Sequence, residues 1–411
     1  MVVLVVVSAL AVVASAATSE VEVLHWWTAG GEAKSVGELK KMLEAKGDHW
    51  KDFAVAGGGG ENAMTVLKTR VLAGNPPAAA QIKGPTIQEW GDEGVLASID
   101  DVARAGGWDA VLPPIVAAIM KYKGHYVAAP VNVHRNNWLW INPALFAKAG
   151  AKIPTNFDEL FAAADKLQKI GVIPIAQGGQ PWQDATMFES VTLGVGGVDF
   201  YKRAFMQLDR NAILSPTMLK VLETYKRIKP YTDKNTPGRD WNLATGLVIN
   251  GKAGMQFMGD WAKGEFLAAG KQPGKDFVCV AAPSTANAFL FNIDSFVMFK
   301  QPHQAAEKGQ RDLAATLMSP QFQEIFNLNK GSIPVRANAD MHKFDSCAQQ
   351  SARDFAADDK AGTLLPSWAH GMALHQSVAG ALQDVVSSFW NSEHMTAREA
   401  QQKLAGALAS Q

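Results

Sequence analysis

The first 85 residues alternate short apolar segments with helical patterns, and this alternation restricts the fold more than any other feature. Strand-like segments are Glu20–Trp27, Phe53–Ala56 and Ala78–Ile82. Between them, apolar residues recur at helical spacing (Val36, Leu39 and Leu43, then Met64, Leu67 and Val71). Strands that alternate with helices favour a largely parallel sheet covered by helices on both faces. An α/β fold is therefore expected, with ligands bound beyond the carboxyl ends of the strands.

The alternation continues beyond this region, and 411 residues are enough for two or three domains. Strand-like segments are expected at Tyr126–Ile141, Ile173–Ala176, Ala253–Met258 and Phe289–Phe299. Thr155-x-x-Asp158 resembles a capping box at the start of an amphipathic helix. Ser319-Pro320 has the chemistry of the start of another helix, which is expected to end at Lys330-Gly331. The last ~50 residues have helical patterns.

Residues 1–17 have the pattern of a secretory signal. Val2–Val13 is almost entirely apolar, and Ala14-Ser15-Ala16 supplies small residues for cleavage, although no Lys or Arg precedes the apolar run. The run is shorter than the roughly 20 residues that span a bilayer. The mature protein is expected in the periplasm. In that oxidising compartment Cys279 and Cys347 either form one disulfide or are two separately buried thiols.

Charge and motif content exclude several classes of function. The chain has 39 basic and 39 acidic residues and a formal net charge of zero, so neither a nucleic-acid surface nor an electrostatic membrane anchor is indicated. The nine histidines show no i, i+4 pairing, and no G-x-S-x-G motif occurs. Gly57–Gly60 lacks the Lys-Ser/Thr of a P-loop and is expected to be a flexible turn. No metal, cofactor or catalytic residue is predicted.

Twelve tryptophans against five tyrosines point to a ligand with flat apolar faces and a polar rim. A sugar ring has this character. Trp26 and Trp27 follow the first strand, and adjacent strand residues face opposite sides, so one indole is expected in the core and the other in a cleft.

Polar residues also gather at expected strand ends. Lys83 follows a buried strand, and Asn292 and Asp294 are expected on one face of an apolar strand, where a ligand rim would satisfy them.

In order and spacing, these segments resemble the periplasmic glucose/mannose-type substrate-binding proteins of ABC importers, within extracellular solute-binding protein family 1. The resemblance runs from Val23 to about His375. Its markers are His25-Trp-Trp-Thr28, Gly57-Gly-Gly-Gly-Glu-Asn62, Ala79-Ala-Gln-Ile-Lys-Gly84, Pro130-Val-Asn-Val-His134 with Asn137-Trp-Leu-Trp140, Met258-Gly-Asp-Trp-Ala-Lys263 and Asn329-Lys-Gly-Ser-Ile-Pro-Val335.

The resemblance implies the two-lobed type II periplasmic-binding-protein fold, with a doubly wound sheet in each lobe and the ligand in the cleft between them. It assigns residues 18–130 plus 288–330 to an N-terminal lobe and residues 131–287 plus 331–411 to a C-terminal lobe. It also implies a monomer that captures a monosaccharide, with glucose favoured over mannose or galactose, and delivers it to membrane permease subunits.

By motif, the resemblance implies that Trp27 and His370 flank a pyranose ring. The remaining pocket residues that it implies are Trp26, Glu32, Lys83, Trp261, Asn292, Asp294 and Lys330, with Trp182 as a further wall residue.

Two alternatives stay open. An exported carbohydrate-active enzyme would use Glu32 and Asp294 as an acid/base pair about 5–10 Å apart. The same clamp would also serve for an oligosaccharide or another polar solute.

Overall fold

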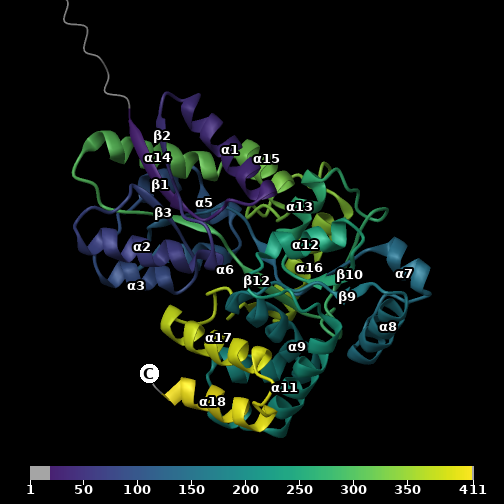
Figure 1. Cartoon of the computed structure of the whole chain (residues 1–411). Coiled ribbons are helices and arrows are strands. Elements are labelled where there is room, and N and C mark those ends of the chain that lie inside the picture. Colours follow the sequence, from purple (N-terminus) through teal and green to yellow (C-terminus); the bar gives the residue numbers. More distant parts are fainter. Residues whose placement is uncertain (1–18, 410–411) are drawn as a thin grey trace, which may run out of the picture.

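The computed structural model describes residues 19–409 and shows two lobes, each built around its own sheet (Figure 1). The expected signal, residues 1–17, lies outside the described residues. In Figure 1 the first lobe is at the upper left and the second lobe extends below it and to the right. Within residues 19–409, no helix has the length and apolar character needed to cross a membrane.

The first lobe contains a five-stranded sheet in the order β2-β1-β3-β13-β6. These strands are β1 (Glu20–His25), β2 (His49–Ala54), β3 (Ala79–Ile82), β6 (Ala128–Pro130) and β13 (Ser295–Met298). β1 is parallel to both β2 and β3, as the alternating pattern predicts, whereas β13 is antiparallel to β3 and β6. The sheet is therefore mixed. Its antiparallel strand, β13, comes from a distant part of the chain.

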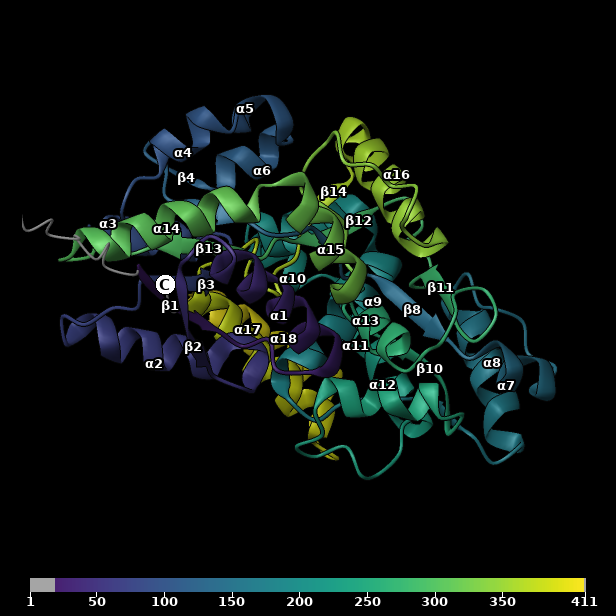
Figure 2. The ribbon, with the colours of Figure 1, turned by 90° about the horizontal axis from the view of Figure 1, so that it is seen from above.

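Helices cover both faces of this sheet. α1, α14 and α15 lie on one side and α2 and α3 on the other, as two perpendicular views show (Figures 1 and 2). The helices of the lobe are α1 (Gly30–Glu44), α2 (Glu61–Leu72), α3 (Thr86–Asp92), α4 (Asp100–Ala105), α5 (Trp108–Val111), α6 (Pro114–Ile119), α14 (Gln304–Leu317) and α15 (Pro320–Lys330), and a hairpin pairs β4 (Lys121–Tyr122) with β5 (His125–Tyr126).

The second lobe contains a four-stranded sheet in the order β11-β8-β10-β9. Its strands are β8 (Trp138–Ile141), β9 (Ile173–Ile175), β10 (Ala253–Phe257) and β11 (Val278–Ala281). β9 and β10 are parallel, and β8 is antiparallel to β10 and β11. The helices of this lobe are α7 (Pro143–Ala149), α8 (Phe157–Lys169), α9 (Pro181–Tyr201), α10 (Arg210–Ile213), α11 (Pro216–Ile228), α12 (Trp241–Ile249), α13 (Ala262–Ala268), α17 (Gln376–Asn391) and α18 (Ala397–Ala409).

A small sheet lies where the chain crosses between the lobes. It consists of β7 (His134–Arg135), β12 (Phe289–Asn292) and β14 (Leu364–Pro366), and α16 (Ser346–Ala361) packs against it. β6 continues into β7 within a few residues, and β12 continues into β13 in the same way. Two of the crossing segments thus lie side by side, since β7 and β12 are paired.

Separate cores stabilise the two lobes. Buried side chains from β1, β3, β13, α14 and α15 form one core, and those from β8, β10, α9, α11, α17 and α18 form another. A smaller cluster surrounds Trp140 and Trp261. Ile333, Val335 and Phe344 belong to the first core. The exact division of the chain between the lobes, with residues 331–411 assigned to the second, stays a prediction.

Three strand predictions were wrong in extent. The strand predicted at Phe53–Ala56 is β2, which begins at His49 and ends at Ala54. Tyr126–Ile141 is not one strand but contributes to β5, β6, β7 and β8, which belong to four different sheets. Phe289–Phe299 divides into β12 and β13 at Ile293 and Asp294, because the chain leaves one sheet and enters another there. Asn292 and Asp294 therefore do not share one face of a single strand.

Helix ends follow local chemistry. The Ser319 hydroxyl accepts a hydrogen bond from the Phe322 N–H at the start of α15, and Gly331 has a φ of 93° at its end, so both predicted ends are confirmed. The cap of α8 lies one residue later than predicted. Asn156 accepts from the Glu159 N–H, while the Glu159 carboxylate binds the hydroxyl and N–H of Thr155.

Cys279 and Cys347 form a disulfide, so the alternative of two separately buried thiols is wrong. The bond joins β11 to the first turn of α16. It therefore ties the edge of the second sheet to the helix that packs on the small crossing sheet.

Candidate functional site

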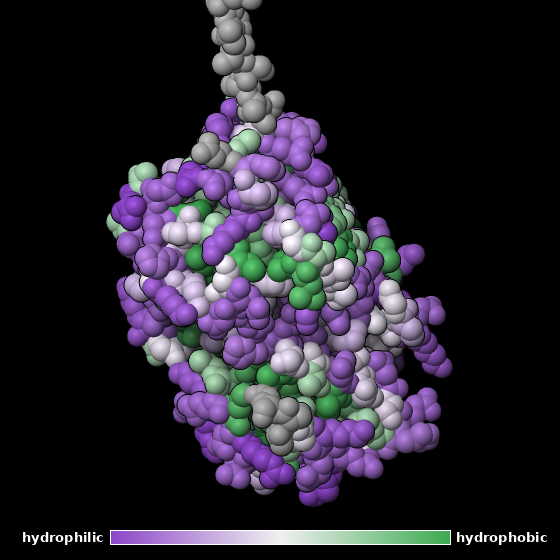
Figure 3. All heavy atoms as spheres, turned by 90° about the vertical axis from the view of Figure 1, so that its left-hand side faces the viewer, coloured by the Kyte–Doolittle hydropathy of each residue, from purple (hydrophilic) through white to green (hydrophobic). Residues whose placement is uncertain are grey.

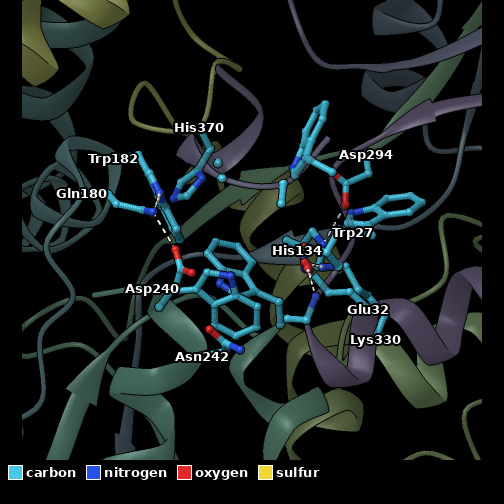
Figure 4. A pocket seen from close by; sticks show the side chains of 18 of the residues that line it. Trp27, Glu32, His134, Gln180, Trp182, Asp240, Asn242, Asp294, Lys330 and His370 are labelled. Atoms are coloured by element: carbon cyan, nitrogen blue, oxygen red, sulfur yellow. Dashed lines mark hydrogen bonds and ion pairs between the residues drawn. The ribbon is translucent and has the colours of Figure 1, made fainter. Parts of the chain in front are cut away.

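A cavity of about 250 Å³ lies between the lobes, at the ends of strands and helices from both. The ten residues that the sequence singled out all border it: Trp26, Trp27, Glu32, Lys83, Trp182, Trp261, Asn292, Asp294, Lys330 and His370. Figure 4 shows His370 and Trp182 facing Trp27, Asp294 and the Glu32–Lys330 pair across the space. We call this space the first cavity.

The two adjacent indoles take different positions. Trp27 is only 2% exposed and packs against Phe296 and Phe326, with ring centroids 5.5 and 5.2 Å away, while one part of it still borders the cavity. Trp26 is half-buried and carries the Lys83 ammonium group 5.2 Å above its ring. Trp27 is thus a core residue at the cavity wall, and Trp26 is the more open cleft residue.

Glu32 and Lys330 form a buried ion pair at 2.6 Å, although they are 298 positions apart. Glu32 lies in the first turn of α1 and Lys330 is the last residue of α15. Each charge is placed where a helix dipole stabilises it, an acid at an N-terminus and a base at a C-terminus. The pair fixes the relative position of the two helix ends below Trp27.

Asp294 is the centre of a buried polar network. Its side chain accepts hydrogen bonds from Gln81 (3.2 Å), Asn132 (3.2 Å) and His134 (3.0 Å). Burial alone would raise the pKa of Asp294, but the hydrogen bond and charge of His134, together with the charges of Lys83 and Lys330, outweigh it and lower this pKa well below its usual value. The Asp294 side chain is therefore a carboxylate.

His134 lies between two carboxylates. Its Nε2 faces Asp294 and its Nδ1 contacts Asp260. Burial opposes the charge, yet the nearby Asp260 and Asp294 raise the pKa of His134 above its ordinary value, so both ring nitrogens carry protons and donate. Sequence reasoning did not select His134, although it ends one of the quoted motifs. Its sequence neighbours, Val133 and Arg135, gave no signal that the ring would be buried between two carboxylates.

The rings of Trp182, Trp261 and His370, which we call the aromatic corner, form the wall opposite Trp27 and Asp294. The His370 ring lies 4.9 Å from the Trp261 ring and 5.8 Å from the Trp182 ring, centroid to centroid. Burial, with the charges of Lys83 and His134, lowers the pKa of His370 well below its ordinary value, so the imidazole is neutral.

The tautomer of His370 follows from Thr186. The single hydroxyl proton of Thr186 goes to the Trp182 carbonyl (2.8 Å), so the hydroxyl oxygen accepts from His370 Nε2 at 2.9 Å. This leaves Nδ1 of His370 as a hydrogen-bond acceptor.

Further lining residues were missed at the sequence level. Gln180, Asp240, Trp241 and Asn242 border the cavity from the start of α9 and the start of α12. Gln180 donates to Asp240 (2.6 Å) and accepts from the Trp182 indole N–H (2.7 Å), which fixes the Trp182 ring. Gln180 and Asp240 come just before α9 and α12, and Trp241 and Asn242 lie in the first turn of α12. None of them directly follows a strand, so the strand-end reasoning did not reach them.

The Gly57–Gly60 loop is a close-packed wall and not the expected flexible turn. All four glycines have positive φ angles, and Gly58–Gly60 form a 3-10 turn. A Cβ atom on Gly59 would lie 3.1 Å from the Trp182 ring, and one on Gly60 would lie 2.9 Å from the Trp26 ring. Side chains at these positions would displace both indoles.

Two polar groups at the cavity have neither a hydrogen-bond nor an ion-pair partner among the described residues. Oδ1 of Asn292 is buried without a hydrogen bond, and the ammonium group of Lys83 has neither a hydrogen bond nor an ion pair there. Burial lowers the pKa of Lys83, although the Asp294 charge opposes this. Buried polar groups normally have partners, so both groups are free to bind a ligand. No cluster of three or more His, Cys, Asp or Glu side chains in residues 19–409 is arranged to hold a metal ion.

A profile of the bacterial extracellular solute-binding protein family matches residues 37–314, which is more than half of the chain. The chain belongs to this family. It is 50% identical over 373 residues to a protein of Brucella melitensis named "Probable sugar-binding periplasmic protein", covering 91% of this chain and 88% of the relative. A protein of Rhizobium meliloti with the same name is 49% identical over 399 residues, covering 97% and 96% of the two chains.

Solved structures confirm the expected type II fold. A chitin oligosaccharide binding protein superimposes with a TM-score of 0.81 at 17% identity, over 96% of this chain and 98% of the other. The bacterial solute receptor AcbH, described as having an exclusive preference for β-D-galactopyranose, gives 0.80 at 16% identity, over 95% and 98%. Since one neighbour takes an oligosaccharide and the other a monosaccharide, the fold alone does not decide ligand size.

The family and these relatives are solute-binding proteins, so the chain is not an enzyme and the hypothesis of an acid/base pair is wrong. The geometry agrees with this conclusion. Glu32 is held in an ion pair with Lys330, and Asp294 is kept ionised by three donors. Neither is available as a general acid.

Proposed function

We propose that the protein captures a monosaccharide in the first cavity and delivers it to the membrane permease of an ABC importer. We propose glucose as the preferred ligand, with mannose and galactose as the other candidates. Capture takes place in the periplasm, without a cofactor and without chemical change to the sugar. The protein acts as a monomer whose lobes close on the ligand.

The observation that carries this proposal is the combination of aromatic rings with unpartnered polar groups in one small space. Trp26, Trp27 and the aromatic corner offer apolar surfaces for the faces of a pyranose ring. Lys83 and Asp294 offer charged groups, which form stronger hydrogen bonds to hydroxyls than neutral groups do. Asn292 Oδ1 lacks a donor that a sugar hydroxyl would supply.

Cavity size supports a small ligand. At about 250 Å³ the first cavity lies below the roughly 300–1,000 Å³ of sites for drug-sized molecules. A hexose has about 12 non-hydrogen atoms, and very small ligands gain up to about 1.5 kcal/mol per atom. Micromolar affinity requires only about 8 kcal/mol. One ring held from two lobes is therefore sufficient.

The relatives support the class of ligand and the partner. Four of them, from Brucella, Rhizobium and Mesorhizobium, are named probable sugar-binding periplasmic proteins, and a Pyrococcus horikoshii relative at 35% identity is named an ABC transporter extracellular-binding protein. A ligand that contacts both lobes would shift the population toward the closed state. The closed form is then what the permease recognises.

Calorimetry of the mature protein with glucose, mannose and galactose tests the proposal. At least one hexose should bind with micromolar or better affinity, and tryptophan fluorescence should change in the same titration. Lys83→Ala should weaken that binding at least tenfold, whereas Lys148→Ala, on the exposed side of α7, should leave it unchanged. Absence of heat and of a fluorescence change with all three hexoses would reject the proposal.

A further inference from the structure

Charged side chains normally lie at the surface of a protein, where water solvates them. On the side of the molecule at the left of Figure 1, hydrophilic side chains cover most of the area (Figure 3). Glu189, in α9, is an exception, because it is fully buried and forms no ion pair within residues 19–409. Burying a carboxyl group costs free energy unless hydrogen bonds compensate. The donors that face Glu189 therefore indicate its role.

Two of these donors belong to one turn, Ser367–His370. The Ser367 hydroxyl donates to Oε1 of Glu189 at 2.6 Å, and the Ala369 N–H donates to Oε2 at 3.3 Å. The turn carries His370, which borders the first cavity, whereas Glu189 does not border it. A residue outside the cavity lining thus binds the turn that supplies a lining residue.

Two further N–H groups of the turn reach Glu189 through one hydroxyl group each. The His370 N–H donates to the Ser367 hydroxyl oxygen at 3.1 Å, and that hydroxyl donates to Glu189. The Trp368 N–H donates to the Tyr201 hydroxyl oxygen at 3.2 Å, and this hydroxyl lies 3.2 Å from Oε2 of Glu189. Three consecutive N–H groups of the turn therefore depend on one carboxyl group.

The same face of α9 also holds the ring of His370. Trp182, Thr186 and Glu189 follow the i, i+4, i+7 spacing of one helix face. The Thr186 hydroxyl oxygen accepts from His370 Nε2 at 2.9 Å, and the Trp182 ring packs beside the imidazole at the cavity (Figure 4). One helix face therefore fixes His370 twice, by its ring through Thr186 and by its backbone through Glu189.

The turn depends on the acceptor oxygens that Glu189 supplies. With an apolar side chain at this position, the Ser367 hydroxyl and the Ala369 N–H would lose their acceptor in a buried place. Because an unpartnered buried donor is costly, the turn would move to find other partners. The His370 ring would move with it and lose its present place against Trp261, whose centroid lies 4.9 Å away.

We propose that Glu189 is a positioning residue for sugar binding, which sets the place of His370 in the first cavity through the Ser367–His370 turn. The inference rests on the proposed function, because the place of His370 changes affinity only if the sugar binds in that cavity. Glu189 lies outside the cavity lining and does not touch the sugar, so its effect on affinity passes through His370.

Glu189→Met fills a similar space without acceptor oxygens, and a double-variant cycle with His370→Ala tests whether its effect passes through the turn. Calorimetry of the mature protein at pH 8 with the best-bound hexose should show at least a tenfold loss of affinity for Glu189→Met. In the His370→Ala background the same change should cost less than twofold, since no imidazole is left to position. The matched control is Asp184→Leu, which removes another buried carboxyl group of α9, one that binds Gln177 and Ser387 and not the turn. It should change the affinity less than twofold.

The place of His370 can also be followed without sugar. Burial, with the charges of Lys83 and His134, lowers the pKa of its imidazole well below the ordinary value, and the charge of Asp294 opposes this. These three charges remain in Glu189→Met, whereas a displaced ring would be in contact with more water. NMR titration of the free protein should therefore show that the pKa of His370 rises toward its ordinary value in this variant.

The positioning role would be overturned by a loss of less than twofold in Glu189→Met, or by an equal loss with and without His370. An equal loss in Asp184→Leu, or an unchanged titration of His370, would overturn it as well. If Glu189→Met does not fold, Ser367→Ala replaces it in both measurements, because it removes the link between Glu189 and the His370 N–H. Absence of hexose binding to the wild type would instead reject the proposed function. The His370 titration would then decide the role of Glu189 by itself, as it would if His370→Ala bound too weakly to measure.

Discussion

Nε2 of His134 lies 3.0 Å from Oδ2 of Asp294, although the two residues are 160 positions apart. They come from the two segments that cross between the lobes, His134 in β7 and Asp294 between β12 and β13. The other ring nitrogen of His134 contacts Asp260, just before α13. A buried cation between two carboxylates thus connects the crossing segments to the cavity and holds the charge of Asp294 toward the ligand site.

Asp294→Asn should weaken hexose binding more than tenfold. The amide has the same shape, but it removes the negative charge and leaves the His134 cation with one carboxylate partner. Calorimetry with the best-bound hexose measures the change, with Asp199→Asn on the surface as the control. An affinity within twofold of the wild type would show that the Asp294 charge does not contribute to binding.

Glu32 and Lys330 should be strongly coupled in folding. Removing one partner of a buried ion pair leaves an uncompensated charge, so Glu32→Gln and Lys330→Met should each lower the free energy of unfolding by about 3 kcal/mol. The double variant should lose less than the sum, with a coupling of about 1–3 kcal/mol. Urea unfolding of the four proteins measures this cycle. If the loss in the double variant equals the sum of the two single losses, water solvates the Glu32 and Lys330 charges and they do not stabilise each other.

Glu189 should make stability depend on pH. It is fully buried and accepts hydrogen bonds from Ser367, Tyr201 and the Ala369 N–H. Burial raises its pKa from 4.5 to about 7, against the opposing effect of these donors. In the unfolded chain Glu189 ionises near pH 4.5, so unfolding releases a proton between pH 4.5 and 7. Its contribution to stability is therefore complete below pH 4.5 and is lost as the pH rises toward 7.

A neutral replacement isolates this effect. The free energy of unfolding of Glu189→Gln, minus that of the wild type, should increase from pH 5 to pH 8 by up to roughly 3 kcal/mol, whatever the pH-independent cost of the amide. Urea unfolding at the two pH values measures the difference. Glu223→Gln, an exposed residue of α11, should show no such increase. An equal difference at both pH values would place the Glu189 pKa near its ordinary value.

Much of the first lobe was predictable because its strands and helices are local patterns. β1 and β3 and the ends of α15 follow directly from alternation and from capping residues. The division of Phe289–Phe299 was not predictable in this way, since both halves are equally apolar. Only pairing with β14 and β7 on one side, and with β3 and β6 on the other, separates them.

The candidate site shows the same limit. Residues beside strand ends, such as Lys83, could be selected because strand ends in α/β sheets are where ligands bind. His134 and Gln180 could not, because their importance depends on partners far away in the sequence: Asp260 and Asp294 for His134, and Asp240 for Gln180. The spacing of Cys279 and Cys347 likewise could not show whether they form a disulfide, because that depends on how α16 packs.

Gly264→Ala should weaken hexose binding without touching the ligand. α13 approaches α1 and α15 so closely that a Cβ atom on Gly264 would lie 2.8 Å from the Asn329 carbonyl oxygen, and Glu265 accepts the Gly31 N–H at 2.8 Å across the same contact. Because α13 belongs to the second lobe and α1 and α15 to the first, this methyl group would oppose closure. We expect at least a tenfold loss of affinity by calorimetry, together with unchanged binding for Gly246→Ala in α12, where a Cβ atom meets nothing within 4 Å. If Gly264→Ala binds as tightly as the wild type, the contact between α13 and the first lobe is not required for the bound state.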